Sequence, residues 1–223
     1  KFLKIHSLFE FEKISEVDKY FAHYTTFENL ESILKNKEIW FSNPLFMNDL
    51  EELKFGINEG KYIIIESKYI KESFVDENVY DEFIRCFLHY IGDYDENFAI
   101  DTYIMCLSQY DLQDTDGRLS MWRSYGGSGD GVAIIFGAEK FPEMEYAPFL
   151  FGKVKYGTPD ERKNLINALC VEFSQIVREL NLEKSAVHVA AYNLFFALRN
   201  FSIFTKHSGF SEEREWRMVY FID

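Results

Sequence analysis

The sequence has few cysteines and no cysteine or histidine spacing that is typical of a metal site. Its three cysteines, Cys86, Cys106 and Cys170, are far apart, and each is set among apolar residues. An odd number of widely spaced cysteines without a CxxC pair is typical of reduced core residues in an intracellular protein. We therefore expect free thiols, no bound metal and a cytoplasmic location.

Long apolar runs and positive charge are also scarce. No stretch approaches the roughly 20 apolar residues that a membrane span requires, and the first residues lack the pattern of a cleavable signal peptide. The net charge is -13, whereas broad nonspecific binding to nucleic acid needs lysines and arginines that neutralise phosphates. The sequence therefore predicts no membrane association and no broad nucleic-acid binding, although a local basic patch is compatible with it.

Aromatic residues, by contrast, are abundant. The 223 residues include 23 Phe and 14 Tyr, and 47% of the chain is hydrophobic. This composition supplies a core for one domain, and the aromatic excess reflects either core packing or an aromatic-walled cleft. We expect a single domain over residues 1–223 of the α+β class, with a mixed β-sheet core and helical insertions at about 48–92 and 158–204.

Residues 20–44 predict a strand, a helix and a second strand in immediate succession. Residues 20–24 form an aromatic extended run, and the capping box at residues 25–28 starts a helix directly after it. A second extended run at residues 38–42 ends at Asn43-Pro44, because proline cannot donate to a sheet ladder. One apolar face of the helix is expected to pack against the strands. That face consists of Phe27, Leu30, Ile33 and Leu34.

Periodicity along the rest of the chain predicts the remaining elements. Helices are expected at about 48–69, 78–91, 119–125, 158–180 and 183–204, and strands at 99–108, 131–137, 149–156 and 213–221. The strands at 99–108 and 131–137 are apolar enough to be buried on both faces. The clearest helix start is at Thr158, which is followed by a proline and two acidic residues.

Two glutamates and two arginines lead into the last predicted strand. If this segment is extended, Glu213, Glu215 and Arg217 share one face. They then form either a surface ladder of ion pairs at a sheet edge or a cleft in which a carboxylate stabilises positive charge in a glycosidic transition state. The spacing alone favours the ladder.

His23 and the segment before the glycines at 126–131 are further candidates. A lone histidine favours a structural role with its ring bonded to backbone groups, but His23 lies between two aromatic residues at a strand end. Trp122 and Tyr125 precede glycines that permit close backbone approach. This is not a Rossmann fingerprint, because the glycines precede a strand instead of joining a strand to a helix.

Five short motifs, in this order over most of the chain, resemble a widespread bacterial family of unknown function. They are His23-Tyr24-Thr25, Phe41-Ser42-Asn43-Pro44 with Asn48-Asp49 and Glu51, Cys106-Leu107-Ser108, Met121-Trp122 with Tyr125-Gly126, and Glu213-x-Glu215-Trp216-Arg217. The first motif and the helix at 26–34 are similar to those of the ADP-ribosyltransferase superfamily, especially the DNA-modifying toxins of toxin–antitoxin pairs.

This resemblance implies an ADP-ribosyltransferase-like sheet and an enzyme that uses NAD to modify a nucleic acid or protein, as a toxin or phage-defence factor with a cognate antitoxin or regulator. It implies His23 on a ribose hydroxyl of NAD, Ser108 or Tyr125 near the nicotinamide, and Glu213 or Glu215 on the ribose 2'-OH. A carboxylate there would stabilise the oxocarbenium-like cation that forms as nicotinamide leaves. The other NAD-binding residues expected from the resemblance are Tyr24, Thr25, Asn43 and Trp122.

Two other function classes remain open. A metal-dependent hydrolase or nuclease would use His23, Asp49, Glu51 and His207, although no HExxH or other known ligand spacing supports it. A non-catalytic module would instead bind a nucleotide or a partner protein in the aromatic cleft. The sequence names neither the acceptor nor the oligomeric state.

Overall fold

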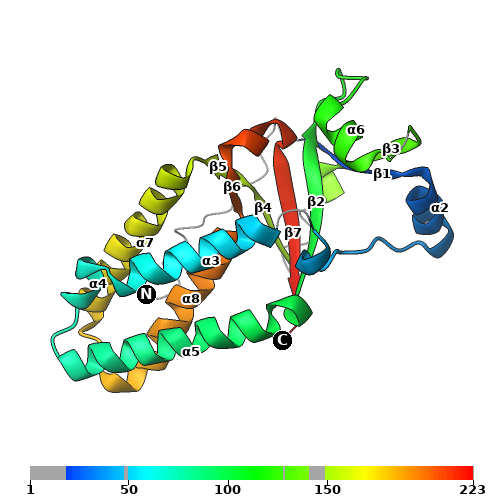
Figure 1. Cartoon of the computed structure of the whole chain (residues 1–223). Helices are drawn as coiled ribbons and strands as arrows, with labels where there is room; N and C mark the ends of the chain where they lie inside the picture. Colours follow the sequence, from blue (N-terminus) through cyan, green and yellow to red (C-terminus); the bar gives the residue numbers. More distant parts are fainter. Residues whose placement is uncertain (1–18, 48–49, 128, 141–148, 223) are drawn as a thin grey trace. The chain divides into compact units, whose positions relative to one another are not determined.

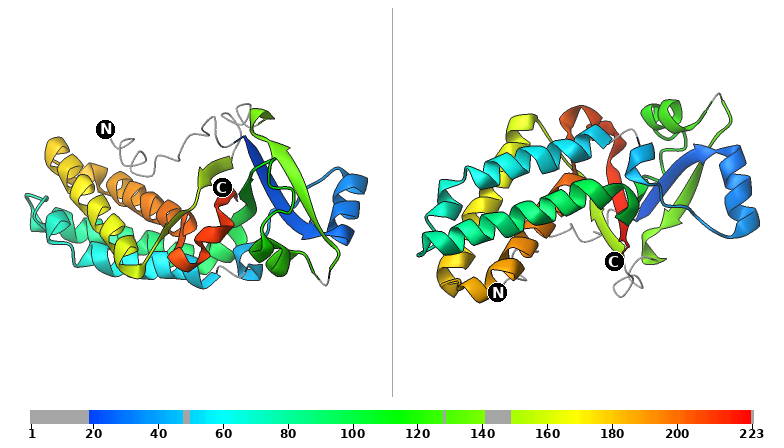
Figure 2. Two further views of the ribbon diagram at one scale, coloured as in Figure 1. Left: turned by 90° about the horizontal axis from the view of Figure 1, so that it is seen from above. Right: turned by 60° about the horizontal axis from the view of Figure 1, so that its bottom comes forward.

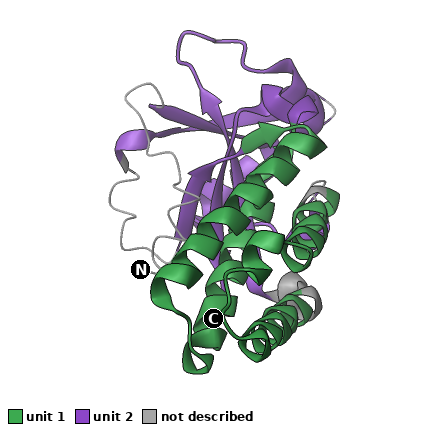
Figure 3. Ribbon diagram, turned by 90° about the vertical axis from the view of Figure 1, so that its left-hand side faces the viewer, with its two compact units in different colours: residues 1–10, 48–99, 155–207 green, residues 11–47, 100–154, 208–223 purple. Residues whose placement is uncertain are grey.

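The structure is a computed structural model of the chain, and it describes residues 19–47, 50–127, 129–140 and 149–222 (Figure 1). The elements are of mixed α/β type with a mostly antiparallel sheet. The chain divides into two compact units, which Figure 3 colours separately. The described residues of 48–99 and 155–207 form unit 1, and those of 11–47, 100–154 and 208–223 form unit 2. Each unit is therefore assembled from stretches that are far apart in the sequence.

Unit 2 is built on a five-stranded sheet with the strand order β3-β1-β2-β7-β4. Its strands are β1 (Tyr20–Thr26), β2 (Thr102–Tyr110), β3 (Gly131–Gly137), β4 (Phe149–Lys153) and β7 (Glu215–Phe221). Every neighbouring pair is antiparallel. The last strand in the sequence, β7, thus lies inside the sheet between β2 and β4. The expected combination of a sheet core with helical segments is confirmed.

The two faces of this sheet are covered differently. On one face, Phe21 of β1 packs edge-on against Trp216 of β7 with ring centroids 5.1 Å apart, and both side chains are fully buried. On the other face, Ala22 and Tyr24 pack against Met121 of the short helix α6 (Leu119–Tyr125). Successive strand residues point to opposite faces. Every residue in the central strands can therefore be assigned either to the face of Phe21 and Trp216 or to the face of Ala22 and Tyr24.

Strands β1 and β2 pair over only part of their length. Their pairing ends at Ala22 and Ser108, after which β1 continues with β3 as its partner and β2 continues with β7. The open edge of β2 is met by Ser42, which exchanges backbone hydrogen bonds of 2.8 and 2.9 Å with Ile104. The expected strand at 38–42 is therefore wrong: the segment makes one isolated bridge and leads into the 3-10 helix η1 (Pro44–Phe46).

Helix α2 (Phe27–Asn36) follows β1 directly, as expected, but its cap and its packing differ. Thr26 is the capping residue, and its Oγ1 accepts a hydrogen bond from the Asn29 backbone N–H at 3.3 Å. No residue of α2 is buried, and Phe27 and Leu34 are 59% and 68% exposed. The helix does contact β1 and β3, with Leu30 and Ile33 half-buried, so the expected packing of its apolar face is confirmed only in part. Helical spacing fixes which residues share a face and not how fully another element covers it.

Unit 1 is mainly helical. Its described elements are α3 (Leu50–Ile65), α4 (Lys68–Lys71), α5 (Glu77–Asp101, whose last two residues belong to unit 2), α7 (Pro159–Leu180), the 3-10 turn η4 (Lys184–Ala186), α8 (Val187–Ile203) and the parallel strand pair β5 (Lys155–Gly157) and β6 (Thr205–His207). The long helices run side by side (Figures 1 and 2) around buried aromatic residues such as Phe83, Phe87 and Phe173. The expected start of α7 is confirmed, since Thr158 and Glu161 form a complete capping box.

Several predicted boundaries are wrong. The strand expected from residue 99 begins at Thr102, because α5 continues to Asp101, and the segment 149–156 forms two strands in different sheets. The last strand begins at Glu215, since residues 208–213 form the 3-10 helix η5 (Ser208–Glu213). Strand β3 contains no buried residue, because it lies at the edge of the sheet. Asn48 and Asp49 lie outside the described residues.

The structure bears on two further predictions, the state of the cysteines and the membrane-spanning capacity of the helices. All three thiols are free; Cys86 and Cys170 are buried, and Cys106 is half-buried. Among the described helices, none combines the length and the apolar character that crossing a bilayer requires.

Candidate functional site

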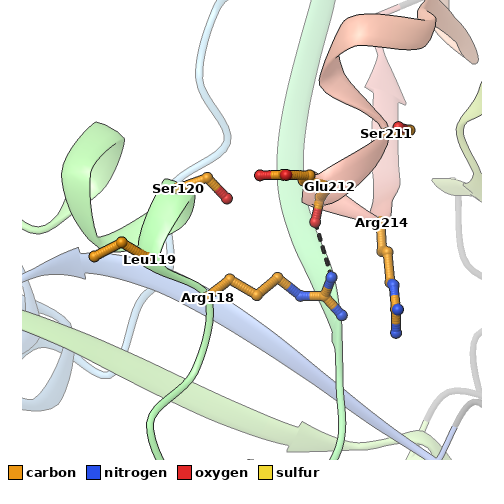
Figure 4. Close-up of a pocket in the computed structure, with 6 residues that line it drawn as sticks. All are labelled: Arg118, Leu119, Ser120, Ser211, Glu212 and Arg214. Carbon is orange, nitrogen blue, oxygen red and sulfur yellow. Dashed lines mark hydrogen bonds between the residues drawn. The ribbon is translucent and has the colours of Figure 1, made fainter.

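An open pocket of about 430 Å³ lies in unit 2 where β2 ends and β7 begins (Figure 4). Two segments that are far apart in the sequence form its walls. Arg118, Leu119 and Ser120 come from the start of α6, whereas Ser211, Glu212 and Arg214 come from η5 and the residue before β7. The segments that precede the Met121-Trp122 motif and the Glu215-Trp216-Arg217 motif therefore meet here.

Arg118 is anchored between three elements. Its Nη1 donates to the Glu212 carbonyl oxygen at 2.8 Å, and its Nη2 donates to the Gln109 carbonyl oxygen at 2.9 Å. Its backbone N–H donates to the Tyr24 hydroxyl at 3.2 Å. Both of these guanidinium acceptors are backbone carbonyl oxygens, and the two bonds orient the Arg118 side chain at the pocket.

Arg214 has an unusual backbone. Its φ is 42°, in the left-handed region that costs an L-residue roughly 1–2 kcal/mol. Two backbone hydrogen bonds hold it there: its N–H donates to the Ser211 carbonyl at 3.3 Å, and its carbonyl accepts from Gln109 N–H at 2.9 Å. The side chain is exposed, and within the described part of the chain it has no hydrogen bond or ion pair. Backbone strain of this kind concentrates at functional positions.

Glu212 supplies a carboxylate to the same pocket. Its side chain is exposed and points towards Ser120 at the start of α6 (Figure 4). The pocket therefore presents two guanidinium groups and one carboxylate. Guanidinium groups match the geometry of phosphate oxygens, and a carboxylate accepts hydrogen bonds from sugar hydroxyls. This arrangement suits a ligand that carries both phosphate and sugar.

Glu215 and Arg217 form a buried ion pair instead of the expected surface ladder. Arg217 Nε lies 2.8 Å from Glu215 Oε1, and Nη2 lies 3.1 Å from Oε2. Glu215 is 3% exposed and Arg217 is 0% exposed. The prediction of a surface ladder at a sheet edge is wrong because β7 lies inside the sheet. Both carboxylate oxygens of Glu215 are occupied by its own strand, and Glu215 does not line the pocket.

His23 lies at the point where β1 and β2 separate. Its Nδ1 is 3.1 Å from the Cys106 carbonyl oxygen. Because a carbonyl only accepts, Nδ1 carries the proton, and Nε2 is an acceptor in the neutral ring. Burial lowers the pKa of His23, and the hydrogen bond to Cys106 opposes this change to a smaller extent. The neutral ring is therefore favoured.

The structure does not bring His23 and Glu215 to one face of the sheet. Ala22, Ser108 and Glu215 are register partners across β1, β2 and β7, so their side chains share a face. His23 follows Ala22 and therefore belongs to the opposite face. Glu213 ends η5, is half-buried, and follows the pocket residue Glu212.

The remaining predicted site residues support the pocket or the helices beside it. Ser108 is 1% exposed, and its hydroxyl donates to the Glu213 carbonyl at 2.6 Å, which holds η5 on β2. Tyr24 and Trp122 contact each other edge to face with centroids 4.7 Å apart, and Tyr125 packs in the same cluster. These residues therefore position Arg118 and α6.

Two of the predicted NAD-binding residues make hydrogen bonds to neighbours in their own segment, and a third borders a second pocket. Thr25 Oγ1 accepts from the Asn29 side-chain amide at 2.9 Å, and Asn43 Oδ1 caps η1 by accepting from Leu45 N–H at 2.9 Å. Trp122 also lines an open pocket of about 400 Å³ together with Arg123 and the glycines at 126, 127, 129 and 131.

The alternative metal site is not assembled in the described part of the chain. Glu51 is exposed, and its Oε1 lies 3.8 Å from Lys54 Nζ. Asp49 is outside the described residues. The described residues hold one group of three or more ligating side chains that are close enough for one ion, and it contains none of His23, Glu51 and His207. That group consists of Glu82, Cys86 and His188.

Sequence reasoning did not single out Arg118, Ser120, Ser211 and Glu212, and it counted Arg214 only among the charged residues that lead into the last strand. Arg118 directly precedes the predicted helix at 119–125, and Glu212 directly precedes the last motif. Charged residues that flank a motif were the available signal. Their meeting in space depends on η5 and on the positive φ of Arg214, which no spacing rule indicates.

Comparison with known proteins gives one family match. Residues 121–218 match the family described as Protein of unknown function (DUF2971). The match supports the sequence prediction of a family of unknown function over this stretch. The DUF2971 region includes Glu212 and Arg214 of the pocket, whereas His23 and Arg118 precede it. Neither a curated protein nor a solved structure matches the chain.

Proposed function

We propose that this protein is an NAD-dependent, ADP-ribosyltransferase-like enzyme of the cytoplasm, and that NAD binds in the pocket between Arg118 and Arg214. Its acceptor is a macromolecule, either a nucleic acid or a protein, and its role is that of a toxin or phage-defence factor with a cognate antitoxin or regulator. The observation that carries the proposal is the convergence of two guanidinium groups and the Glu212 carboxylate in one open pocket.

Each group has a role that follows from its chemistry. Arg118 and Arg214 bind the pyrophosphate of NAD, because a guanidinium donates two parallel hydrogen bonds to phosphate oxygens. Glu212 accepts a hydrogen bond from a ribose hydroxyl, as the sequence resemblance implied for Glu213 or Glu215. The buried pair of Glu215 and Arg217 supports the strand from which η5 projects.

The reaction breaks the bond between nicotinamide and the ribose. Nicotinamide leaves with the bonding electron pair, an acceptor atom forms a new bond to the anomeric carbon, and the acceptor loses its proton to solvent. Positive charge develops on the ribose ring after the bond to nicotinamide begins to break and before the acceptor bond is complete. A carboxylate that is oriented before the reaction stabilises this charge, and such electrostatic contributions commonly change rates by about 10²–10³.

A second candidate is a non-catalytic module that binds a nucleotide in the same pocket. Two observations favour it: Arg217 occupies both oxygens of Glu215, and His23 belongs to the other face of the sheet. In this case a nucleotide binds and no nicotinamide is released.

The test measures NAD binding by calorimetry and nicotinamide release from labelled NAD with nucleic-acid and protein acceptors. Arg214→Gln is expected to weaken NAD binding about tenfold or more, the size of one charge-assisted hydrogen bond. Glu212→Gln is expected to retain binding and to reduce release by about 10²-fold or more. Arg178→Gln removes an exposed arginine of α7 and is the matched control. Binding without release in the wild type selects the second candidate. A wild type that binds no NAD overturns the first candidate, and one that binds no nucleotide overturns both.

A further inference from the structure

Helices α5 and α8 bring three metal-ligating side chains together in unit 1. Glu82 and Cys86 are four residues apart on α5 and therefore lie on one face of that helix. His188 is in the first turn of α8. One ligand atom from each of the three lies within 4.8 Å of the other two. The group combines a carboxylate, a thiol and an imidazole.

The separations are close to those around a tetrahedral ion. Cys86 Sγ lies 3.7 Å from His188 Nε2 and 4.0 Å from Glu82 Oε1. Bonds of about 2.0–2.3 Å to a tetrahedral zinc ion place ligand atoms roughly 3.5 Å apart. The His188 side chain is exposed, so its ring can turn to shorten the remaining separation without moving the core.

The surroundings hold the first two ligands in place and leave the third accessible. Cys86 is 5% exposed and belongs to the hydrophobic core of unit 1. Arg85 Nη2 pairs with Glu82 Oε2, which leaves Oε1 on the side of Cys86. An ion can therefore reach the thiol from the exposed His188 side, where solvent meets the start of α8.

We propose that Glu82, Cys86 and His188 bind one Zn²⁺ ion that links α5 to the first turn of α8. Thiolate, imidazole and carboxylate are the ligands that zinc takes in proteins, and three protein ligands leave a fourth position for water. Cys86 binds as the thiolate, and its proton passes to solvent. The site lies in unit 1, so it is independent of the nucleotide pocket proposed for unit 2.

The test titrates chelator-treated, reduced protein with Co²⁺ and then with Zn²⁺. Wild type is expected to bind about one Co²⁺ per chain with a near-ultraviolet absorption band from thiolate-to-cobalt charge transfer, and Zn²⁺ is expected to displace it. Cys86→Ser removes the band. His188→Gln changes an exposed side chain and lowers Zn²⁺ affinity at least about tenfold, in the range for a disturbed metal site.

His89→Gln is the matched control, because His89 is an exposed histidine of the same helix α5. It is expected to keep the wild-type affinity. Zn²⁺ is also expected to raise the melting temperature of wild type and His89→Gln by more than that of His188→Gln, since a ligand that binds only the folded state stabilises it in proportion to its binding. A wild type without the charge-transfer band, or a His188→Gln variant with unchanged affinity, overturns the proposal.

Discussion

Arg217 holds both carboxylate oxygens of Glu215 inside the sheet of unit 2, with Nε 2.8 Å from Oε1 and Nη2 3.1 Å from Oε2. The two residues are on one face of β7, where neither side chain is open to solvent. A buried charge is tolerated when it is paired, and the loss of one partner leaves the other uncompensated. This relationship makes a double-mutant cycle informative.

Glu215→Ala is expected to reduce the free energy of unfolding by about 3–5 kcal/mol, because it leaves the Arg217 guanidinium buried without its carboxylate. The double variant Glu215→Ala with Arg217→Met is expected to cost less than Glu215→Ala and Arg217→Met added together, since neither charge of the pair then remains buried. Urea unfolding of the four proteins measures these energies. Strict additivity would show that the pair contributes no coupling.

Arg214→Gly is expected to stabilise the protein while it weakens NAD binding. A glycine avoids the roughly 1–2 kcal/mol cost that an L-residue pays at φ 42°. Ordering the more flexible glycine backbone on folding costs about 0.5–1 kcal/mol. The free energy of unfolding is therefore expected to rise by roughly 0.5 kcal/mol. The control is Lys37→Gly at the end of α2, where φ is 56°. It should stabilise similarly and leave binding unchanged. A destabilised Arg214→Gly protein would contradict the assignment of strain.

His23 makes stability depend on pH through its lowered pKa. The unfolded chain protonates this histidine near its ordinary value of 6.5, whereas the folded protein requires a lower pH because burial disfavours the charged ring. The stability contributed by neutral His23 is therefore present above that ordinary value and is lost as the pH falls below it. His23→Gln should show a smaller loss of unfolding free energy in urea titrations on the acid side of neutrality. A profile parallel to that of the wild type would contradict this account.

Gly56 and Gly92 provide a matched pair of helical glycines. A Cβ atom at Gly56 in α3 would lie 2.6 Å from the Ser202 Cα of α8, whereas nothing lies within 4 Å of one at Gly92 in α5. Gly56→Ala is therefore expected to destabilise by about 1–3 kcal/mol, and Gly92→Ala is expected to stabilise by about 0.5–1 kcal/mol. Thermal and urea unfolding distinguish the two. Equal effects would show that α3 and α8 can separate to admit a methyl group.

Local features of this fold were predictable, and non-local ones were not. The start of α7 at Thr158 and the succession of β1 and α2 depend on neighbouring residues, so caps and periodicity indicate them. The position of β7 depends on pairing with distant strands, and the error over Glu215 followed from placing that strand at an edge. The carboxylate in the pocket is Glu212 because β7 begins only at Glu215 and the chain turns at Arg214, between η5 and β7.

The position of β7 also determines when the sheet can be completed during synthesis. Residues 215–221 leave the ribosome after every other strand of unit 2, yet β7 is the only described partner of β4 and covers one edge of β2. Until then β2 has an open edge, which is a template for pairing with other chains. A chain that stops at Arg214 thus exposes this edge, so we expect it to aggregate more readily than a chain that includes β7.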